Sequence, residues 1–172
     1  LGPEQTIAVL PELAEKGVKA GFVVSGGFRE SGFEGTELEK ELVEVANSLE
    51  MTIAGPNGQG FVSTPANLCS QIVSPYPPLG NISIASQSGN ILSAMLNQAR
   101  ARNIGIARAI SIGNQAQVDI AEYIRYFGRD PETKVIVSYV EGLPNGRDFY
   151  DSLKEVSCDK PVILSLIHIS EP

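Results

Sequence analysis

The chain has 172 residues, of which 42% are hydrophobic and 19% are charged, and its formal net charge is -7. This composition is typical of a folded globular protein and excludes an intrinsically disordered one. The acidic balance argues against a nucleic-acid-binding role, because phosphate backbones are bound by clustered Lys and Arg. An anionic cofactor is still compatible with it, because backbone amides can hold phosphate groups.

Targeting and redox features are sparse. The longest apolar runs are far shorter than the roughly 20 residues that span a bilayer, and no basic and apolar leader opens the chain. Cys69 and Cys158 lie far apart and match no metal-ligand spacing, so we expect two ordinary buried or half-buried thiols. We therefore expect a protein of the reducing cytoplasm, with no structural metal, no nucleic-acid partner and no membrane partner.

The first third of the chain alternates between helix and strand patterns. Apolar residues at helical spacing predict a helix from Pro3 to Lys16, and a short apolar strand follows from Lys19 to Val24. Thr36 and Glu39 fit a capping box, which predicts a second helix beginning there, before a strand over 51–54. The order α-β-α-β favours a parallel sheet, and we assign residues 1–62 to a first domain.

Proline then becomes frequent. Pro65, Pro75, Pro77 and Pro78 fall between residues 63 and 80, together with several serines. Proline-rich composition at an element boundary is typical of a semi-rigid linker. We therefore expect a linker over 63–80 and a domain boundary there.

The alternation resumes after this stretch. Apolar runs predict strands, and amphipathic stretches between them predict helices. The strands are expected at 81–85, 106–111, 134–140 and 161–163, and the helices at 88–103, 118–128 and 148–156. Near-continuous apolar strands separated by helices indicate a parallel sheet covered on both faces. Residues 81–163 are therefore predicted to form a flavodoxin-like α/β domain.

The last nine residues, 164–172, resemble the translation of a transposase-end sequencing adapter. They read Leu-Ser-Leu-Ile-His-Ile-Ser-Glu-Pro. We expect them to be a library artefact rather than part of the protein. His168 is the only histidine of the chain, so we expect it to serve neither as a phosphoryl acceptor nor as a metal ligand.

The most informative motif is Ser86-Gln87-Ser88-Gly89, which joins a predicted strand to a predicted helix. Such a helix start offers unpaired N–H groups and the positive end of the helix dipole, so it favours anions such as phosphate. Gly89 lets a ligand approach the backbone closely. Plain N-capping is the alternative explanation. A second turn, Gly55-Pro56-Asn57, follows the strand over 51–54.

Other candidates stand at the same predicted edge of the second sheet. Glu141 follows the apolar strand over 134–140, and Gly113-Asn114 follows the strand over 106–111. Open α/β sheets bind ligands at the carboxyl ends of their strands. The alternatives are an exposed loop glutamate and a simple turn. Four further carboxylates are expected on the solvated surface, namely Asp130, Glu132, Asp148 and Asp151.

Eight segments of the chain together match the pattern of a known family. They are Lys16–Ala20, Ser25–Glu30, Gly55–Asn57, Ser86–Gly89, Gly113–Asn114, Asp130–Thr133, Tyr139–Gly142 and Lys160–Val162. In their order and spacing they resemble the CoA-binding and ligase-like domains of the NDP-forming acyl-CoA synthetases, a family that includes the succinyl-CoA synthetase α subunit and ADP-forming acetate–CoA ligase. The resemblance implies the end of a Rossmann-like CoA-binding domain followed by a flavodoxin-like ligase domain.

The resemblance also implies a phosphoryl relay. Acyl-CoA and phosphate give an acyl phosphate, a histidine accepts the phosphoryl group, and ADP or GDP receives it on a Mg²⁺-binding ATP-grasp domain or β subunit. The resemblance assigns the roles of family residues to the positions of this chain that match the same motifs. Glu141 matches the glutamate that pairs with the phosphohistidine. CoA would contact Ser25, Gly26, Gly27, Phe28, Gly55, Pro56 and Asn57, and phosphate would contact Ser86, Gln87, Ser88, Gly89 and Asn114.

Departures from the family pattern bear on these expectations. The family often has Cys after Gly-Pro-Asn, whereas Gly58-Gln59 stands here, which leaves the acyl substrate open. The first strand and Gly-rich loop of the CoA domain are missing before Leu1, and the acceptor histidine of the family lies beyond the Lys-Pro-Val strand. We therefore expect the 172-residue chain alone to be inactive and the full-length enzyme to be an oligomeric acid–thiol ligase.

Two other functions fit the sequence. The same domains fused to an acetyltransferase domain would form the CoA- or nucleotide-sensing part of a protein lysine acetyltransferase. A non-catalytic α/β ligand-binding module is the other alternative. A downstream histidine segment with an ATP-grasp domain favours the ligase, and an acetyltransferase domain favours the sensor. Failure of CoA to raise the unfolding midpoint of an intact CoA domain would favour the non-catalytic module.

Overall fold

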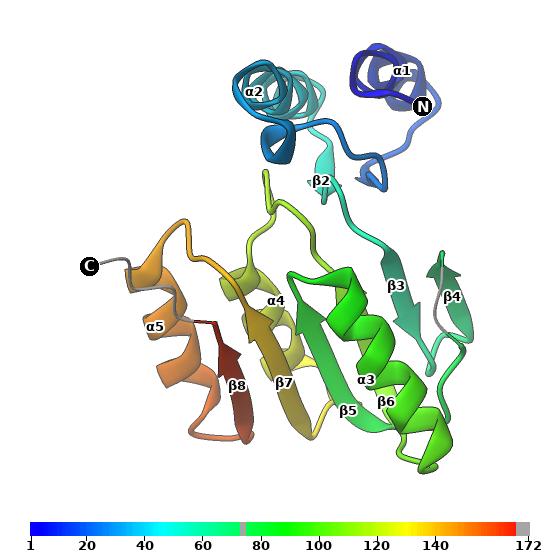
Figure 1. Ribbon diagram of the computed structural model, residues 1–172, viewed down its shortest axis with the longest axis vertical. Coiled ribbons are helices and arrows are strands. Elements are labelled where there is room, and N and C mark those ends of the chain that lie inside the picture. Colours follow the sequence, from blue (N-terminus) through cyan, green and yellow to red (C-terminus); the bar gives the residue numbers. More distant parts are fainter. Residues whose placement is uncertain (73–74, 168–172) are drawn as a thin grey trace. The chain divides into compact units, whose positions relative to one another are not determined.

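The computed structural model describes residues 1–72 and 75–167, and His168 lies outside the described residues. The chain forms two compact units (Figure 1). The first comprises residues 1–58 and 112–118, and the second comprises 59–111 and 119–172. The division near residue 58 is close to the expected boundary, but the sequence did not indicate that 112–118 would belong to the first unit.

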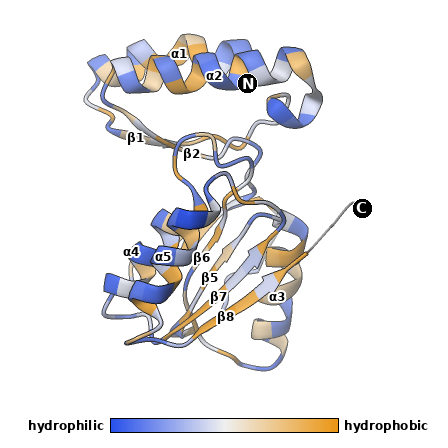
Figure 2. Ribbon diagram, turned by 90° about the vertical axis from the view of Figure 1, so that its left-hand side faces the viewer, coloured by the Kyte–Doolittle hydropathy of each residue, from blue (hydrophilic) through white to orange (hydrophobic). Residues whose placement is uncertain are grey.

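The first unit packs two helices on two short parallel strands. Its elements are α1 (Pro3–Glu15), β1 (Ala20–Phe22), the 3-10 helix η1 (Arg29–Ser31), α2 (Phe33–Ser48) and β2 (Thr52–Ala54). Strands β1 and β2 are parallel, with Ala20 opposite Thr52, and both helices lie on the same side of them (Figure 2). The buried core residues include Ile7, Leu10, Phe28, Leu42, Ala46 and Ile53. The predicted α-β-α-β order is confirmed.

Helix α2 begins earlier than its sequence suggests. Its N-cap is Gly32, whose φ of 98° suits glycine, and the turn of η1 leads directly into it. Thr36 lies inside the helix, where its hydroxyl donates to the Gly32 carbonyl at 3.0 Å. Glu39 is buried and accepts a hydrogen bond from the N–H of Arg29 at 3.3 Å. The predicted capping box of Thr36 and Glu39 is therefore wrong, because Glu39 is engaged in tertiary contacts.

The second unit is built on one six-stranded sheet. In spatial order the strands are β4 (Leu68–Gln71), β3 (Gly60–Ser63), β6 (Ile106–Ser111), β5 (Leu79–Ser86), β7 (Val135–Val140) and β8 (Val162–Leu166). The last four are parallel. Numbered along the chain, these four run 2-1-3-4, which is the flavodoxin order. The predicted flavodoxin-like α/β fold is confirmed.

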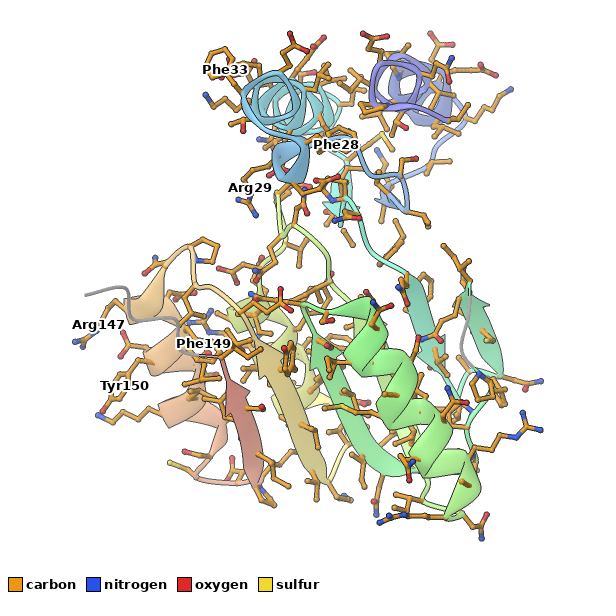
Figure 3. All side chains as sticks on the ribbon, viewed as in Figure 1. Phe28, Arg29, Phe33, Arg147, Phe149 and Tyr150 are labelled. Atoms are coloured by element: carbon orange, nitrogen blue, oxygen red, sulfur yellow. The ribbon has the colours of Figure 1, made fainter. Side chains whose placement is uncertain are left out.

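Helices cover both faces of this sheet. Helix α3 (Gly89–Ala101) lies on one face, and α4 (Ile120–Arg129) and α5 (Gly146–Val156) lie on the other (Figure 2). Each begins at a side-chain cap, and the caps are Ser88, Asp119 and Asn145. Figure 3 shows Phe149 of α5 directed toward the sheet. Among the described residues, no helix has the length and apolar content to cross a membrane.

The expected linker over 63–80 contains strand β4 and one end each of β3 and β5. Strands β3 and β4 form an antiparallel hairpin, with Gly60 opposite Gln71, and β3 also pairs with β6. The turn between them uses Asn67 in a left-handed conformation with a φ of 50°. Proline content masked two short strands with a turn between them. The expectation for residues 73–74 falls outside the described residues.

Strand β8 extends through three residues of the segment 164–172. Leu164 pairs with Ser138, and Leu166 pairs with Val140. The artefactual origin of 164–172 stays a prediction, since strand pairing carries no information about where a segment was encoded. Segment 164–172 continues in His168–Pro172, which the structure does not describe.

Asp130 is the centre of a buried polar network rather than a solvated carboxylate. It accepts hydrogen bonds from Arg108 Nε at 2.8 Å and Nη2 at 2.9 Å, and from Thr133 Oγ1 at 2.6 Å. Burial by itself raises the pKa of Asp130, but the hydrogen bonds from Arg108 and Thr133 outweigh it and hold the pKa below its usual value. The expected surface position of Asp130 is therefore wrong.

We predict that Asp130→Ala lowers the free energy of unfolding by about 3 kcal/mol, because Arg108 would lose its buried partner. Asp151→Ala, at an exposed pair with Arg147, is the control and should cost less than about 1 kcal/mol. Urea unfolding measures both. Because the pKa of Asp130 is depressed in the folded state, its contribution is present above about pH 4 and lost as pH falls further. A pH-independent difference between wild type and Asp130→Ala would contradict this account.

Candidate functional site

The candidate site of the second unit lies where the strand order reverses. Strand β5 pairs with β6 on one side and with β7 on the other. The connections leaving β5 and β7 therefore emerge beside each other at the carboxyl edge, and ligands of such sheets bind at this point. The predicted residues 86–89 and Glu141 stand on these two connections. The structure thus brings these two sets of predicted site residues to one edge.

The first turn of α3 leaves backbone donors available. Ser88 Oγ accepts from the N–H of Ile91 at 3.4 Å, and the Ser88 carbonyl accepts from the N–H of Leu92 at 3.1 Å. Within residues 1–72 and 75–167, the N–H groups of Gly89 and Asn90 donate to no protein group. Both N–H groups stand at the positive end of the helix dipole. An anion such as phosphate fits this arrangement.

Besides Ser88, which caps α3, two residues of the loop have buried side chains that form hydrogen bonds. Ser86 is fully buried, and its hydroxyl donates to the Ser88 carbonyl at 2.7 Å. Gln87 is 9% exposed, and its amide bonds to the backbone of residues 141 and 142. Ser88 and Gly89 are half-buried, and Asn90 is exposed. The accessible anion donors are therefore at 88–90, shifted toward the helix relative to the predicted 86–89.

Gln59 covers the first turn of α3, and the sequence did not single it out for this position. Its amide donates from Nε2 to Asn90 Oδ1 at 3.3 Å and accepts at Oε1 from Ser93 Oγ at 3.2 Å. A Cβ at position 89 would overlap the Gln59 side chain. A side chain at position 89 would thus require Gln59 to move. No local pattern links residues 59 and 89, because the β3–β4 hairpin and β5 separate them.

Glu141 is exposed just beyond β7. Tyr139, two residues earlier, has its pKa raised by burial, by the charge of Glu141 and by a hydrogen bond to the Glu141 carboxylate. An exposed carboxylate at the edge of the sheet can accept a hydrogen bond from an incoming imidazole.

In the first unit, the predicted loops after β1 and β2 meet. The N–H of Asn57 donates to the Ser25 carbonyl at 2.9 Å, and a Cβ at Gly26 would contact Asn57 Oδ1 at 3.4 Å. Phe28 is fully buried in the core, so its side chain does not face a ligand. Gly55 and Pro56 are buried as well. Ser25, Gly26 and Asn57 are the residues of this group that a ligand can reach with least rearrangement.

Carboxylates occupy the remaining donors of these loops. Glu30 Oε1 accepts from the N–H of Gly27 at 2.5 Å and of Phe28 at 3.2 Å. Burial raises the pKa of Glu30, but hydrogen bonds from Asn114 and from these N–H groups outweigh it and lower the pKa. The N–H groups of Gly27 and Phe28 are therefore not free for the phosphates of a cofactor.

Asn114 holds two carboxylates together in the first unit. Its Nδ2 donates to Glu30 Oε2 at 2.5 Å and to Glu39 Oε2 at 2.7 Å, and its carbonyl accepts from the Arg29 guanidinium. Both amide hydrogens are thereby used. The phosphate-binding role of Asn114 stays a prediction. In this structure its Oδ1 also accepts from Asn57 Nδ2 at 3.4 Å, and its N–H donates to the Pro56 carbonyl at 2.8 Å. This cluster was missed because its members come from three distant segments.

Metal ligands are not grouped in the part of the chain that the structure describes, where no three His, Cys, Asp or Glu residues could hold an ion. Cys69 and Cys158 are free and exposed, so the expectation of buried or half-buried thiols is wrong. The chemistry of the described site is thus that of backbone donors, amides and one exposed carboxylate.

The chain is similar in sequence to proteins named as ADP-forming acetate–CoA ligases. The chain is 40% identical over 155 residues to "Acetate--CoA ligase [ADP-forming]" of Methanocaldococcus jannaschii, covering 90% of this chain and 22% of that protein. It is 40% identical over 154 residues to "Acetate--CoA ligase [ADP-forming] II subunit alpha" of Pyrococcus furiosus, covering 90% of this chain and 34% of that protein. The chain thus spans between a fifth and about a third of these relatives.

A solved structure shows the same fold. The dinucleotide forming acetyl-coenzyme A synthetase 1 of Ca. Korarchaeum cryptofilum, in complex with phosphate and ADP, superposes with a TM-score of 0.91 and 35% identity. The superposition covers 96% of this chain and 36% of that one.

Four parallel strands in flavodoxin order, with helices on both faces of the sheet, place the second unit in the class of flavodoxin-like α/β domains. Within that class, the family described as "Succinyl-CoA ligase like flavodoxin domain" matches residues 79–169. The chain belongs to this family.

We predict that Gly89→Ala destabilises the second unit by about 1–3 kcal/mol, because the added methyl group overlaps Gln59. Gly146→Ala is the matched control, since a Cβ there meets no atom within 4 Å. Urea unfolding of both variants measures the difference. Adding Gln59→Ala to Gly89→Ala should recover most of the loss, and a double variant no more stable than Gly89→Ala would contradict the overlap.

We also predict that Asn114→Asp destabilises the first unit by about 2–3 kcal/mol at pH 7, because a third carboxylate would stand between Glu30 and Glu39. Asn97→Asp on the exposed face of α3 serves as control and should change stability by no more than about 0.5 kcal/mol. Thermal unfolding at pH 7 and pH 4.5 is the measurement. The deficit should shrink at the lower pH as carboxylates protonate, and a larger deficit there would refute the assignment.

Proposed function

We propose that this chain is the CoA-proximal and phosphate-binding portion of an NDP-forming acyl-CoA synthetase. The full-length enzyme would interconvert acyl-CoA, NDP and phosphate with a carboxylic acid, CoA and NTP. Relatives named as ADP-forming acetate–CoA ligases at 40% identity support this reaction class. The observation that carries the proposal is the free N–H pair of Gly89 and Asn90 at the switch point.

Phosphate is the ligand that the second unit fits. The N–H groups of Gly89 and Asn90 and the dipole of the 13-residue helix α3 would hold its negative charge. Ser88 caps the helix and keeps these donors oriented, and Gln59 packs over Gly89 beside them. Donors fixed before the reaction stabilise the charge that develops during phosphoryl transfer.

CoA is the ligand proposed for the first unit. Ser25, Gly26 and Asn57 are the accessible members of the two loops, and they offer hydroxyl, backbone and amide groups. Since Glu30 occupies the N–H groups of Gly27 and Phe28, these loops fit the neutral pantetheine arm better than the phosphates of CoA. Phe28, Gly55 and Pro56 would act through the backbone and the shape of the loops.

Glu141 is the proposed partner of a phosphorylated histidine supplied by the full-length enzyme. Its carboxylate would accept a hydrogen bond from the imidazole and stabilise the cationic ring during transfer. NDP and Mg²⁺ would bind on an ATP-grasp domain or subunit. The assembly would be a cytoplasmic oligomer, and its acyl substrate is left open by Gly58 and Gln59.

The proposal is tested by assaying the full-length protein for ATP or GTP formation from acetyl-CoA, phosphate and the matching NDP. Glu141→Gln should lower kcat by about 10²-fold, because the amide cannot stabilise an imidazolium ring. Glu132→Gln, at an exposed glutamate of the same unit, is the matched control and should retain activity.

Activity across a panel of CoA thioesters identifies the acyl group. Failure of every thioester with both nucleotides would refute the proposed reaction. Equal activity of Glu141→Gln and wild type would refute the role of Glu141 alone.

A further inference from the structure

We propose that Gln87 is a positioning residue that fixes the direction in which Glu141 leaves strand β7. This inference rests on the proposed function, since Glu141 is its reacting partner there. It reassigns Gln87, because the sequence predicted a phosphate contact for this residue.

The side-chain amide of Gln87 binds three backbone groups of the next loop. Its Oε1 accepts from the N–H of Glu141 and from the N–H of Gly142, the latter at 2.9 Å. Its Nε2 donates to the Gly142 carbonyl at 2.6 Å. Three partners around one planar amide leave residues 141 and 142 little freedom to rotate.

This amide acts as an extension of the sheet. The β5–β7 ladder ends with Ser86 opposite Tyr139, and the N–H of Gln87 donates to the Tyr139 carbonyl at 3.1 Å. Beyond that bond the backbones of the two strands diverge toward α3 and α5. The Gln87 side chain then supplies the donor and acceptor that a further strand residue would have supplied. It holds the loop after β7 at the point where Glu141 begins.

Glu141 is therefore held through the backbone. Gln87 accepts a hydrogen bond from the N–H of Glu141, and the N–H of Gln87 donates to the Tyr139 carbonyl at 3.1 Å. Because Gln87 and Tyr139 are both buried at the edge of the sheet, the direction in which the exposed Glu141 leaves the strand is set before a histidine arrives. A flexible glutamate would have to lose that freedom in each catalytic cycle.

The same contacts argue against Gln87 as a phosphate ligand. Its side chain is 9% exposed, and a phosphate could reach its amide only by displacing the backbone of Gly142. Buried polar groups that lose their partners without replacement are costly. Phosphate is better served by the N–H groups of Gly89 and Asn90.

The test compares Gln87→Met and Gln87→Glu with Gln98→Met in the full-length protein. Methionine keeps the length of the side chain and removes all three hydrogen bonds, whereas glutamate keeps the acceptor for two N–H groups. Gln98 is exposed on α3 and is the matched control. Rates of nucleoside triphosphate formation are measured against thioester and phosphate concentrations, and amide hydrogen exchange is followed in peptides covering 141–143.

We expect Gln87→Met to lower kcat by about 10- to 100-fold while KM for thioester and phosphate changes by less than about twofold. Gln87→Glu should recover part of kcat, and exchange at 141–142 should accelerate in Gln87→Met but not in Gln98→Met. If Gln87→Met fails to fold, Gln87→Glu is tested instead. We then expect its kcat to be lower than that of wild type and its amide exchange at 141–142 to be faster, and wild-type values of both would overturn the positioning role.

Different failures have different meanings. An active wild type with Gln87→Met equal to Gln98→Met in kcat overturns the positioning role alone. A rise in KM for phosphate with unchanged kcat in Gln87→Met overturns it in favour of a phosphate contact. A wild-type protein without triphosphate formation overturns the proposed function and this role together, whatever the exchange data show.

Discussion

The parallel pairing of β5 with strands on both sides is the constraint on which the site depends. Because the chain crosses from β6 past β5 to β7, helices α3 and α4 lie on opposite faces of the sheet (Figure 2). The loops that follow β5 and β7 must then separate at the carboxyl edge. Ser86 is the last residue of β5 in the ladder, and everything proposed for catalysis lies within five residues of it or of Tyr139.

Close packing around that edge explains which residues are needed there. The β3–β4 hairpin brings Gln59 over the first turn of α3, where a side chain at position 89 would overlap it. Ser88 caps the helix, so the donors of Gly89 and Asn90 remain for a ligand. On the side of the loop after β7, the Gln87 side chain donates a hydrogen bond to the Gly142 carbonyl. Access and rigidity thus come from the same small group of residues.

Local patterns predicted most elements, since the strand over 106–111 and the helices near 3–16, 88–103 and 118–128 each bury a regular apolar stripe. They failed where distant segments decide the outcome. Glu39 reads as a helix cap beside Thr36, yet it binds Asn114, which is 75 residues away. The hairpin of β3 and β4 was hidden by Pro65 and by the prolines that follow it, and Asp130 was interpreted as exposed because Arg108 is 22 residues distant.

The site was predictable to the same extent. Strand ends are visible in the sequence, so the placement of Glu141 and of residues 86–89 at one edge of the sheet could be predicted, while their roles stay predictions. The hydrogen bonds of the individual loop residues could not be predicted, because the Gln87 side chain is bound by the distant β7 loop. Ser86 bonds within its own loop, and the N–H groups of Gly89 and Asn90 donate to no group of the described residues.

The central claim is that the N-terminus of α3 holds phosphate, and Asn90→Asp tests it most directly. An aspartate in the first turn favours the helix and can still accept from Gln59, so the fold should be kept. Its charge would repel phosphate. In the full-length protein we predict that KM for phosphate rises about tenfold or more while KM for the CoA thioester stays unchanged. An unchanged KM for phosphate in a folded Asn90→Asp protein would contradict the account.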